Sequence, residues 1–567
     1  MSKQAFDETF DFVVVGSGGG SMVAGLVMRS VGKSVVVLEK MPRIGGTTSR
    51  SGGVMWIPNN PFMKAEGIED SFDKAMTYME ATAGQSLDAP GTTRERRAAY
   101  VTEGPKMLDF LIRNGIKLRR MPWWPDYYDD RPGGSVPGRT VVADLFNVNE
   151  LGTWKNKLEP NFMKVPAYHN EGFEIGLMKS SWKGKVAMMK VGWRIVLAKL
   201  TGKEWTTAGG ALQGRMMQAS LAAGVDLRVN AGVTSFISEG GRVTGVVTQK
   251  DGKPWRIGAK LGVLVNAGGF SHNQAMRDKY QSGTSVEWTA TPGGNTGEMI
   301  QEMEKLGAQL AQMEEMVGNQ MSIPPGVRNT GDGIELSAVG GQMNISKPHS
   351  FVVDQSGLRY MNEAGSYMEF CQNMLKRNRE VPAIPSWWVV DQQYMEKYMY
   401  TGTMAGTKKP QNWYEEGFLK RADSIEELAA QIGIDPKVLR ATTDRFNGYA
   451  RAGKDDEFGR GNRAYDNWLG DFHRQDGSHA LGTVEQGPFY AAPVVPGDVG
   501  TYGGAVTDVH GRVLRADGSV IEGLYATGIS TASVMGRIYP GAGSSVGPSF
   551  VFGYIAAKHA ANADNVA

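Results

Sequence analysis

Cysteine is almost absent from this sequence: Cys371 is the only one among 567 residues. A single cysteine excludes an intrachain disulfide and fits a reducing compartment. We expect Cys371 to be a buried residue without a chemical role. The seven histidines are scattered without the spacing of a metal-ligand set, so we expect no metal site. The 61 Lys and Arg residues nearly balance the 59 Asp and Glu residues, so the net charge gives no reason to expect a nucleic-acid partner.

Long hydrophobic runs are missing as well. No run of about 18 uncharged apolar residues exists, so we expect no membrane-spanning helix. The N-terminal stretch MSKQAFDETF has no apolar core behind a basic start, so we expect no secretory signal and a cytoplasmic location. The length of 567 residues is enough for two or more domains. The 75 glycines cluster at turns, which suits a protein whose backbone approaches a nucleotide closely.

The chain is organised around a glycine-rich stretch near its N-terminus. Residues 12–15 predict a buried strand, and the glycines that follow turn the chain into a helix. Gly16 permits the tight turn, and Gly18 allows the backbone to approach a pyrophosphate at the helix N-terminus. A second strand, 34–38, brings Glu39 to where it can accept hydrogen bonds from a ribose. The pattern predicts a dinucleotide site and leaves NAD and FAD open; its predicted contacts are Gly16, Ser17, Gly18, Gly19, Gly20, Ser21, Glu39 and Lys40.

A second loop of small residues favours FAD over NAD. It combines a glycine pair with hydroxyl side chains, which supply donors along a pyrophosphate and a ring edge. We expect cofactor contacts from Gly45, Gly46, Thr47, Thr48, Ser51, Gly52 and Gly53. A later strand, 261–265, ends in a glycine pair at which the backbone is expected to approach the cofactor closely. The C-terminal segment again contains glycine-rich turns before a final helix. These parts add Ala267, Gly268, Gly269, Asn295, Gly528, Gly543, Ser545 and Val546 to the predicted cofactor contacts.

Glycine-rich segments at opposite ends of the chain predict a split domain around an insert. The predicted fold class is α/β, with a Rossmann-like FAD-binding domain built from both chain ends and an inserted α+β substrate domain. We assign residues 1–290 and 499–567 to the FAD-binding domain and residues 291–498 to the substrate, or catalytic, domain. Within the insert, residues 347–360 predict a hairpin, and the caps at Ser424 and Asp435 predict a helix pair.

Two segments permit more than one interpretation. The loop 121–128 contains two prolines and four aromatic residues; we favour packing over an aromatic wall for a flat ligand. In the extra segment 140–205, one helical stripe is apolar and lysines flank it. We favour a buried helix or an oligomer contact, and peripheral membrane contact through 174–205 is the alternative hypothesis. The stripe consists of Trp182, Val186, Met189, Trp193, Leu197 and Leu200.

Several motifs together resemble the 3-ketosteroid Δ1-dehydrogenases, over nearly the whole chain. They are the segments 16–20, 45–47, 125–128, 359–367 and 539–543. The resemblance is weakest across 140–205, a segment that is long for the family and would fit the cholest-4-en-3-one Δ1-dehydrogenase subtype, which acts on sterols that retain a side chain. Ser21 and Ala542 depart from the family pattern without removing a side chain that the chemistry needs.

The resemblance implies a reaction and roles for four residues. A 3-ketosteroid would lose a C1 hydride to N5 of noncovalently bound FAD and a C2 proton to a tyrosine, giving a 3-keto-1,4-diene. By resemblance, Tyr539 and the backbone N–H of Gly543 bind the C3 oxygen, Tyr367 is the base and Tyr127 supports it as a relay. The electron acceptor, a quinone or a carrier, and the oligomeric state stay open. Rival interpretations are a flavoprotein acting on another steroid bond, such as Δ4 of a 5α-steroid, on another enone or on a dicarboxylate, and a membrane-associated flavin electron-transfer protein.

Overall fold

The computed structural model describes residues 5–563, so residues 1–4 and 564–567 of the two predicted FAD-binding segments lie outside it. Its largest sheet has eight strands, and the main path runs β19–β20–β11–β1–β2–β8. The strands from β20 to β8 along this path are parallel, and β19 is antiparallel. The path contains β1 (Glu8–Val15), β2 (Val35–Leu38), β8 (Asp226–Arg228), β11 (Lys253–Val265), β19 (Arg512–Leu514) and β20 (Val520–Ala526).

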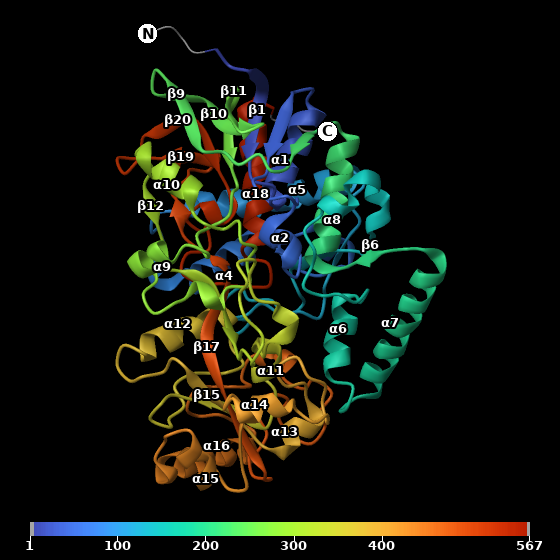
Figure 1. Ribbon diagram of the computed structural model, residues 1–567, viewed down its shortest axis with the longest axis vertical. Helices are drawn as coiled ribbons and strands as arrows, with labels where there is room; N and C mark the ends of the chain where they lie inside the picture. The colour runs from blue at the N-terminus through green and yellow to red at the C-terminus, as the bar shows by residue number, and fades with distance from the viewer. Residues whose placement is uncertain (1–4, 564–567) are drawn as a thin grey trace.

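Both ends of the described chain build this sheet, as the split-domain prediction requires. β1 and β2 come from the N-terminal part and β20 from the C-terminal part, with β11 hydrogen-bonded between β1 and β20. Helices α1 (Gly19–Ser30) and α18 (Val546–Ala561), from opposite ends of the chain, pack on each other beside the sheet (Figure 1). A Cβ at Gly553 would lie 2.3 Å from the carbonyl oxygen of Gly20, so glycine is needed where the two helices touch.

Two antiparallel hairpins extend the sheet through β9 (Ser235–Glu239) and β10 (Arg242–Lys250). They turn at glycine-containing turns around residues 240 and 252. The neighbouring helices are α2 (Gly46–Arg50), α4 (Phe72–Ala83), α5 (Arg94–Arg113), α8 (Ala208–Ala222) and α10 (Glu298–Lys305). The apolar faces of α4, α5 and α8 form the largest buried core of the described chain with the sheet, and α10 packs in a second core.

The inserted part forms a second, antiparallel sheet at the other end of the molecule (Figure 1). Its strands are β13 (Met316–Met321), β14 (Ser350–Val353), β15 (Ser386–Val390), β16 (Lys420–Ala422) and β17 (Phe489–Thr501). Helix α12 (Tyr367–Arg377) packs against β13, and the predicted helix pair is α15 (Ile425–Gln431) and α16 (Pro436–Ala452). The fold-class prediction of a Rossmann-like domain with an α+β insert is therefore confirmed.

The predicted hairpin over 347–360 is wrong. β14 forms there, but it pairs with β15 and not with the residues that follow it. The chain after β14 turns at Gly357 instead, because Arg359 enters a buried ion cluster that takes this segment away from the sheet.

The segment 140–205 contains a helical hairpin at the side of the molecule. Helices α6 (His169–Gly176) and α7 (Trp182–Thr201) pack on each other, and α7 occupies the outer edge (Figure 1). Only Gly184, Ala187 and Val191 of α7 are buried. The buried-helix alternative is therefore wrong, because the large apolar side chains of α7 face outward, whereas the oligomer contact stays a prediction.

Candidate functional site

A cavity of about 610 Å³ lies at the carboxyl ends of the central parallel strands. Val15 ends β1 and Leu38 ends β2, and both line the cavity. Ligands of open α/β sheets bind at this position, because the turns after the strands place backbone N–H groups there. The same cavity continues to Tyr367 at the first position of α12, so it joins the glycine-rich region to the inserted domain.

Most of the predicted cofactor residues line this cavity. They come from four separate parts of the chain, which only the tertiary structure brings together. The lining includes Gly16, Ser17, Gly18, Glu39, Lys40, Gly46, Thr47, Thr48, Ser51, Gly52, Ala267, Gly268, Asn295, Gly528, Ser545 and Val546.

Seven predicted cofactor residues do not line the cavity; they are Gly19, Gly20, Ser21, Gly45, Gly53, Gly269 and Gly543. Several of them support the fold behind it. A Cβ at Gly19 would overlap the ring of Phe550 on α18, and a Cβ at Gly53 would meet the backbone at the start of α8. The N–H of Gly45 donates to the Ser17 hydroxyl, and the N–H of Gly269 donates to the Asn295 side chain. Their place in the structure is behind or beside the lining residues.

Glu39 holds the first turn of the nucleotide region. One carboxylate oxygen accepts from the backbone N–H of Ser17 at 3.1 Å and from its hydroxyl at 2.6 Å, and the other accepts from the N–H of Met41 at 2.9 Å. Burial raises the pKa of Glu39, and these hydrogen bonds oppose the rise. Because the carboxylate faces the cavity, it can also accept hydrogen bonds from ribose hydroxyls.

Three tyrosines meet at the inserted-domain end of the cavity. The ring centroid of Tyr367 lies 5.2 Å from that of Tyr539 and 5.6 Å from that of Tyr127. All three line the cavity, and hydrogen bonds join the Tyr367 hydroxyl to those of Tyr127 and Tyr539. Burial raises the pKa of each of the three hydroxyls, so each is a neutral phenol near neutral pH. The structure thus brings together the three tyrosines that the resemblance implied.

Gly543 lies beside Tyr539 in a backbone conformation that favours glycine. Its φ is +99°, and a Cβ there would lie 2.4 Å from the carbonyl oxygen of Val54. The backbone N–H of Gly543 hydrogen-bonds the Tyr539 hydroxyl. Two hydrogen-bond donors, a phenol and a backbone amide, therefore point into one region, as a site for a carbonyl oxygen requires.

A fourth tyrosine, Tyr465, belongs to this group and was missed from the sequence. It lies in helix α17 (Ala464–Leu469), with its ring centroid 4.2 Å from that of Tyr127. The Tyr465 hydroxyl hydrogen-bonds Tyr127 and accepts from the Gln342 amide at 3.1 Å. No motif surrounds this residue, so only the fold reveals it. The hydroxyls form a chain that runs Tyr539, Tyr367, Tyr127, Tyr465.

The aromatic loop 121–128 does more than pack. Trp124 and Tyr127 line the cavity, whereas the Tyr128 side chain is buried behind it. The preference for packing was therefore wrong for Trp124 and Tyr127.

The sequence matches the FAD binding domain family over residues 11–546. It is 40% identical to a 3-oxosteroid 1-dehydrogenase of Mycolicibacterium smegmatis, over 97% of each chain. The chain belongs to the 3-ketosteroid Δ1-dehydrogenase family. The crystal structure of the family member from Sterolibacterium denitrificans, in complex with 1,4-androstadiene-3,17-dione, superposes with a TM-score of 0.90. The two sequences are 34% identical, and the match covers 98% of this chain and 100% of that chain. A 4-oxocyclohexanecarboxylate 2-dehydrogenase of Sinomonas cyclohexanicum is also 34% identical, over 97% of this chain and 92% of its own.

The cavity residues fit the FAD that the family binds. Helices α1 and α18 both begin at the cavity, and their N-cap residues, Gly18 and Ser545, place no side-chain cap over the helix ends. Such N-termini attract the negative charge of a pyrophosphate and of a reduced flavin. At Gly18 a Cβ would lie 3.0 Å from the Asn266 amide nitrogen, so a side chain there would narrow the approach to α1. The residues named above would hold the dinucleotide, with α1 toward its pyrophosphate and α18 toward the flavin.

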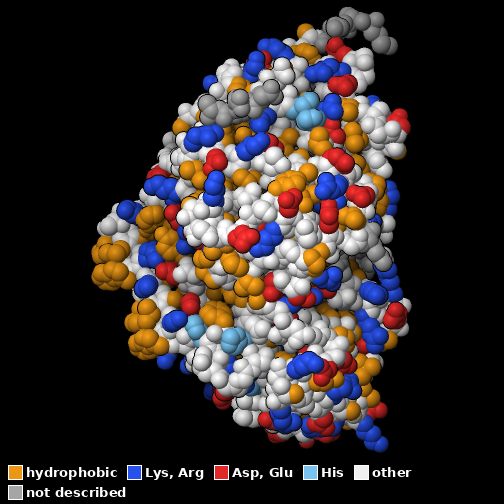
Figure 2. Space-filling view, turned by 180° about the vertical axis from the view of Figure 1, so that it is seen from behind, with side chains coloured by type: hydrophobic (Ala, Val, Ile, Leu, Met, Phe, Trp, Pro, Cys, Tyr) orange, Lys and Arg blue, Asp and Glu red, His pale blue; other side chains and the backbone are white. Residues whose placement is uncertain are grey.

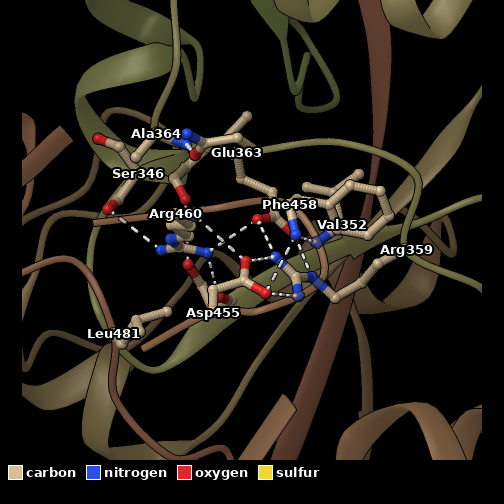
Figure 3. Close-up of polar contacts among 12 residues, drawn as sticks. Ser346, Val352, Arg359, Glu363, Ala364, Asp455, Phe458, Arg460 and Leu481 are labelled. Carbon is tan, nitrogen blue, oxygen red and sulfur yellow. Dashed lines mark hydrogen bonds and ion pairs between the residues drawn. The ribbon is translucent and has the colours of Figure 1, made fainter. Parts of the chain in front are cut away.

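A buried ion cluster fixes the chain just before Tyr367 (Figure 3). Arg359 pairs with Glu363 and with Asp455, each at 2.8 Å, and Arg460 pairs with Glu363 at 3.3 Å. All four side chains are fully buried. Because Glu363 lies four residues before Tyr367 and Asp455 lies in the segment that leads to Tyr465, the cluster ties together the supports of both tyrosines.

Proposed function

We propose that this chain catalyses the 1,2-dehydrogenation of 3-ketosteroids, with C2–H and C1–H bonds broken and a 3-keto-1,4-diene formed. FAD, when bound, accepts the C1 hydride at N5. One observation carries the proposal: Tyr367, Tyr539 and the N–H of Gly543 converge beside a cavity that also holds the FAD-binding residues. The names of the relatives support the same substrate class.

The C3 ketone would accept hydrogen bonds from the Tyr539 hydroxyl and the Gly543 N–H. Burial raises the pKa of Tyr539, so its proton is retained and available for donation. Both donors would strengthen their hydrogen bonds as negative charge develops on the oxygen, which weakens the C2–H bond. Loss of one donor of this kind reduces the rate by about 10²–10³-fold.

Tyr367 would receive the C2 proton. Tyr367 would first lose its own proton, and the resulting tyrosinate would take up the C2 proton and become a neutral phenol again; the Tyr127 hydroxyl, which is hydrogen-bonded to Tyr367, would stabilise the anion until then. Tyr127 is in turn hydrogen-bonded to Tyr465, so the charge of a transient tyrosinate is spread over three hydroxyls. A carboxylate base in the same place would cost more to desolvate.

The cavity suits an uncharged, apolar substrate. Among the described residues that line it there is no arginine. Its two lysines are already engaged: Lys40 pairs with Glu298 at 2.7 Å, and Lys347 donates to the carbonyl oxygens of Leu469 and Gly470. A dicarboxylate or a ring carboxylate would find no unpaired guanidinium here, so a neutral ketone is the better match.

Anaerobic titration with steroid tests the reaction. Androst-4-ene-3,17-dione should bleach the flavin absorbance, and mass spectrometry and NMR should identify the 1,4-diene. A 5α-steroid that lacks the Δ4 bond serves as the comparison, because a Δ4-forming enzyme would give the 4-ene instead. Absence of bleaching, or a double bond formed elsewhere, would refute the proposal. A panel of quinones and protein carriers in the reoxidation half-reaction would identify the electron acceptor.

We propose further that α7 holds the enzyme on an anionic membrane surface. In the described part of the chain no helix is long and apolar enough to cross a bilayer. α7 instead exposes a face of large apolar side chains; the exposed fractions are 69% for Trp182, 63% for Trp193 and 76% for Leu200. Figure 2 shows these hydrophobic side chains at the edge of the molecule, with basic side chains between them. Each lysine near an anionic surface contributes about 1 kcal/mol.

Vesicle sedimentation tests the membrane contact. Reversal of two exposed lysines of α7, Lys183→Glu and Lys190→Glu together, should reduce binding to vesicles that contain phosphatidylglycerol by tenfold or more. The matched control is Lys253→Glu with Lys437→Glu, which changes the net charge equally at two exposed sites outside α7. If both double variants lost vesicle binding equally, binding would depend on net charge and a role for α7 would be refuted. Unchanged vesicle binding by the α7 double variant would also refute that role.

A further inference from the structure

A second cavity of about 870 Å³ lies between α6 and the segment 464–479 of the inserted domain. Its outer rim is exposed: Val136 is 51% exposed, and Asn170 and Gly477 are also on the surface. Its inner wall contains Trp123, Phe173 and Trp468. The cavity therefore opens to the outside and ends in aromatic rings.

Phe173 lines both cavities and so lies between them. Its ring centroid is 4.7 Å from Trp468 and 5.2 Å from Trp124, and Trp124 faces the main cavity. The partition is thus made of side chains and not of backbone. Trp124 and Trp468, whose ring centroids are 4.8 Å apart, belong to the same partition, and a smaller side chain at position 173 would open it beside them.

The second cavity is aligned with the catalytic tyrosines. Trp468 touches Tyr465, with ring centroids 5.8 Å apart, and Tyr465 stacks on Tyr127. Tyr539, the proposed ketone-binding residue, also contacts Tyr127, with ring centroids 6.0 Å apart. A flat molecule whose ketone binds there would extend toward Phe173 with its far end.

The chemistry of the second cavity suits a hydrocarbon. Glu174, which lines it, already has a partner, because its carboxylate lies 2.7 Å from the His473 ring. The lining also contains Asn467, Ser478 and His479. The rings of Trp123, Phe173 and Trp468 offer dispersion contacts to an apolar chain.

We propose that the second cavity binds the aliphatic C17 side chain of a sterol-type substrate and that Phe173 controls access to it. The proposal rests on the proposed dehydrogenase function, because it requires the steroid ring system in the main cavity. A tailless steroid would fill the main cavity alone, whereas a side chain would displace the Phe173 ring and continue to Trp468 and Trp123. Phe173 is thus a specificity-determining residue.

The experiment compares kcat/KM for cholest-4-en-3-one and androst-4-ene-3,17-dione, both in the same detergent. Asn170→Trp places an indole at the rim of the second cavity and should lower the ratio of the two values by about tenfold, the scale of lost apolar contacts in a pocket. Phe173→Ala removes the partition and should raise that ratio. The matched control is Gln475→Trp, an equally large substitution at an exposed residue outside the cavity lining, which should leave the ratio as it is.

An unchanged ratio in both Asn170→Trp and Phe173→Ala would overturn the inference, and so would equal losses for the two steroids. FAD content and bleaching by androst-4-ene-3,17-dione establish that each variant is folded. Failure of the unmodified enzyme to turn over either steroid would instead overturn the proposed function, and this inference with it.

Discussion

The hydroxyl chain at the site predicts a graded loss of activity along its length. Tyr367→Phe, Tyr127→Phe and Tyr465→Phe each remove one hydroxyl and keep the ring. The rings pack at centroid distances of 4.2 to 5.6 Å, so phenylalanine preserves the contacts that hold the site. Any loss of rate therefore measures the hydroxyl.

The magnitudes follow from the position of each hydroxyl. Tyr367→Phe removes the group that receives the proton and should slow flavin reduction by about 10²–10⁴-fold, the usual contribution of general-base catalysis. Tyr127→Phe leaves Tyr367 without its hydrogen-bond partner, and loss of a partner to a charged group costs about 1.5–3 kcal/mol, or about 10–10²-fold. Tyr465→Phe acts one step farther away and should cost about 1 kcal/mol, or about fivefold.

Stopped-flow measurement of flavin reduction with saturating steroid separates these losses from substrate binding. Steroid dissociation constants of the Tyr127→Phe and Tyr465→Phe variants should stay within a few-fold of the unmodified enzyme. If the Tyr367→Phe variant reduced its flavin as fast as the unmodified enzyme, Tyr367 would not be the base. Equal losses at all three positions would refute the graded chain and indicate general damage to the site.

The same chain predicts a pH dependence. Burial raises the pKa of Tyr367 above the usual tyrosine value, so the fraction of tyrosinate increases throughout the accessible alkaline range. The reduction rate should therefore rise with pH and show no plateau below pH 10, the ordinary pKa of tyrosine. A plateau near pH 7 would indicate a different base.

Three further predictions concern other parts of the chain. Tyr539→Phe should lower kcat by about 10²-fold and raise KM, because one ketone donor is lost; unchanged steady-state kinetics would exclude it from ketone binding. Glu363→Gln should lower the free energy of unfolding by about 3–5 kcal/mol, because buried Arg359 and Arg460 lose their shared partner; a denaturant midpoint equal to that of the unmodified enzyme would contradict this. Burial lowers the pKa of His169 to about 4, below its unfolded value of 6.5, so the unfolded chain binds a proton first as the pH falls. Stability should therefore decline between pH 6.5 and 4, by up to about 3 kcal/mol, and the decline should be smaller in His169→Gln, as urea unfolding across that range would show.

Local patterns were sufficient to predict the nucleotide half of the site. The strand over 12–15, the turn at Gly16 and the acid at Glu39 are linked by short-range geometry, so their spacing in the sequence determines their relation in space. The C-terminal return to the same cavity was also predictable, because glycine-rich turns at both chain ends have few other uses. Gly53 and Gly269 show the limit of this reasoning: glycine can serve the packing of the protein as well as a ligand.

The inserted domain was less predictable for a physical reason. Tyr465 reaches the site through long-range contacts: the Asp129 carboxylate accepts from its backbone N–H at 3.1 Å, and the ion cluster around Arg359 and Asp455 fixes the segment before it. No local spacing in the sequence records these contacts. The same cluster explains the error at 347–360, where local alternation favoured a hairpin but burial of an arginine decided the path of the chain. Long-range electrostatic contacts of this kind override strand propensity.

The α6–α7 hairpin links the exposed apolar face to the second cavity. Arg194 of α7 pairs with Glu171 of α6 at 2.7 Å, and Glu174 of α6 pairs with His473 across the cavity margin. A sterol that leaves a bilayer at α7 would keep its apolar surface out of water if it passed directly to the aromatic wall. Yet the two roles of the hairpin use different side chains, so they should be separable. The lysine reversals on α7 should weaken vesicle binding without altering the ratio of kcat/KM values in detergent, and Asn170→Trp should alter that ratio without weakening vesicle binding. If each variant changed both quantities, the hairpin would act as one structural unit and not as two adjacent sites.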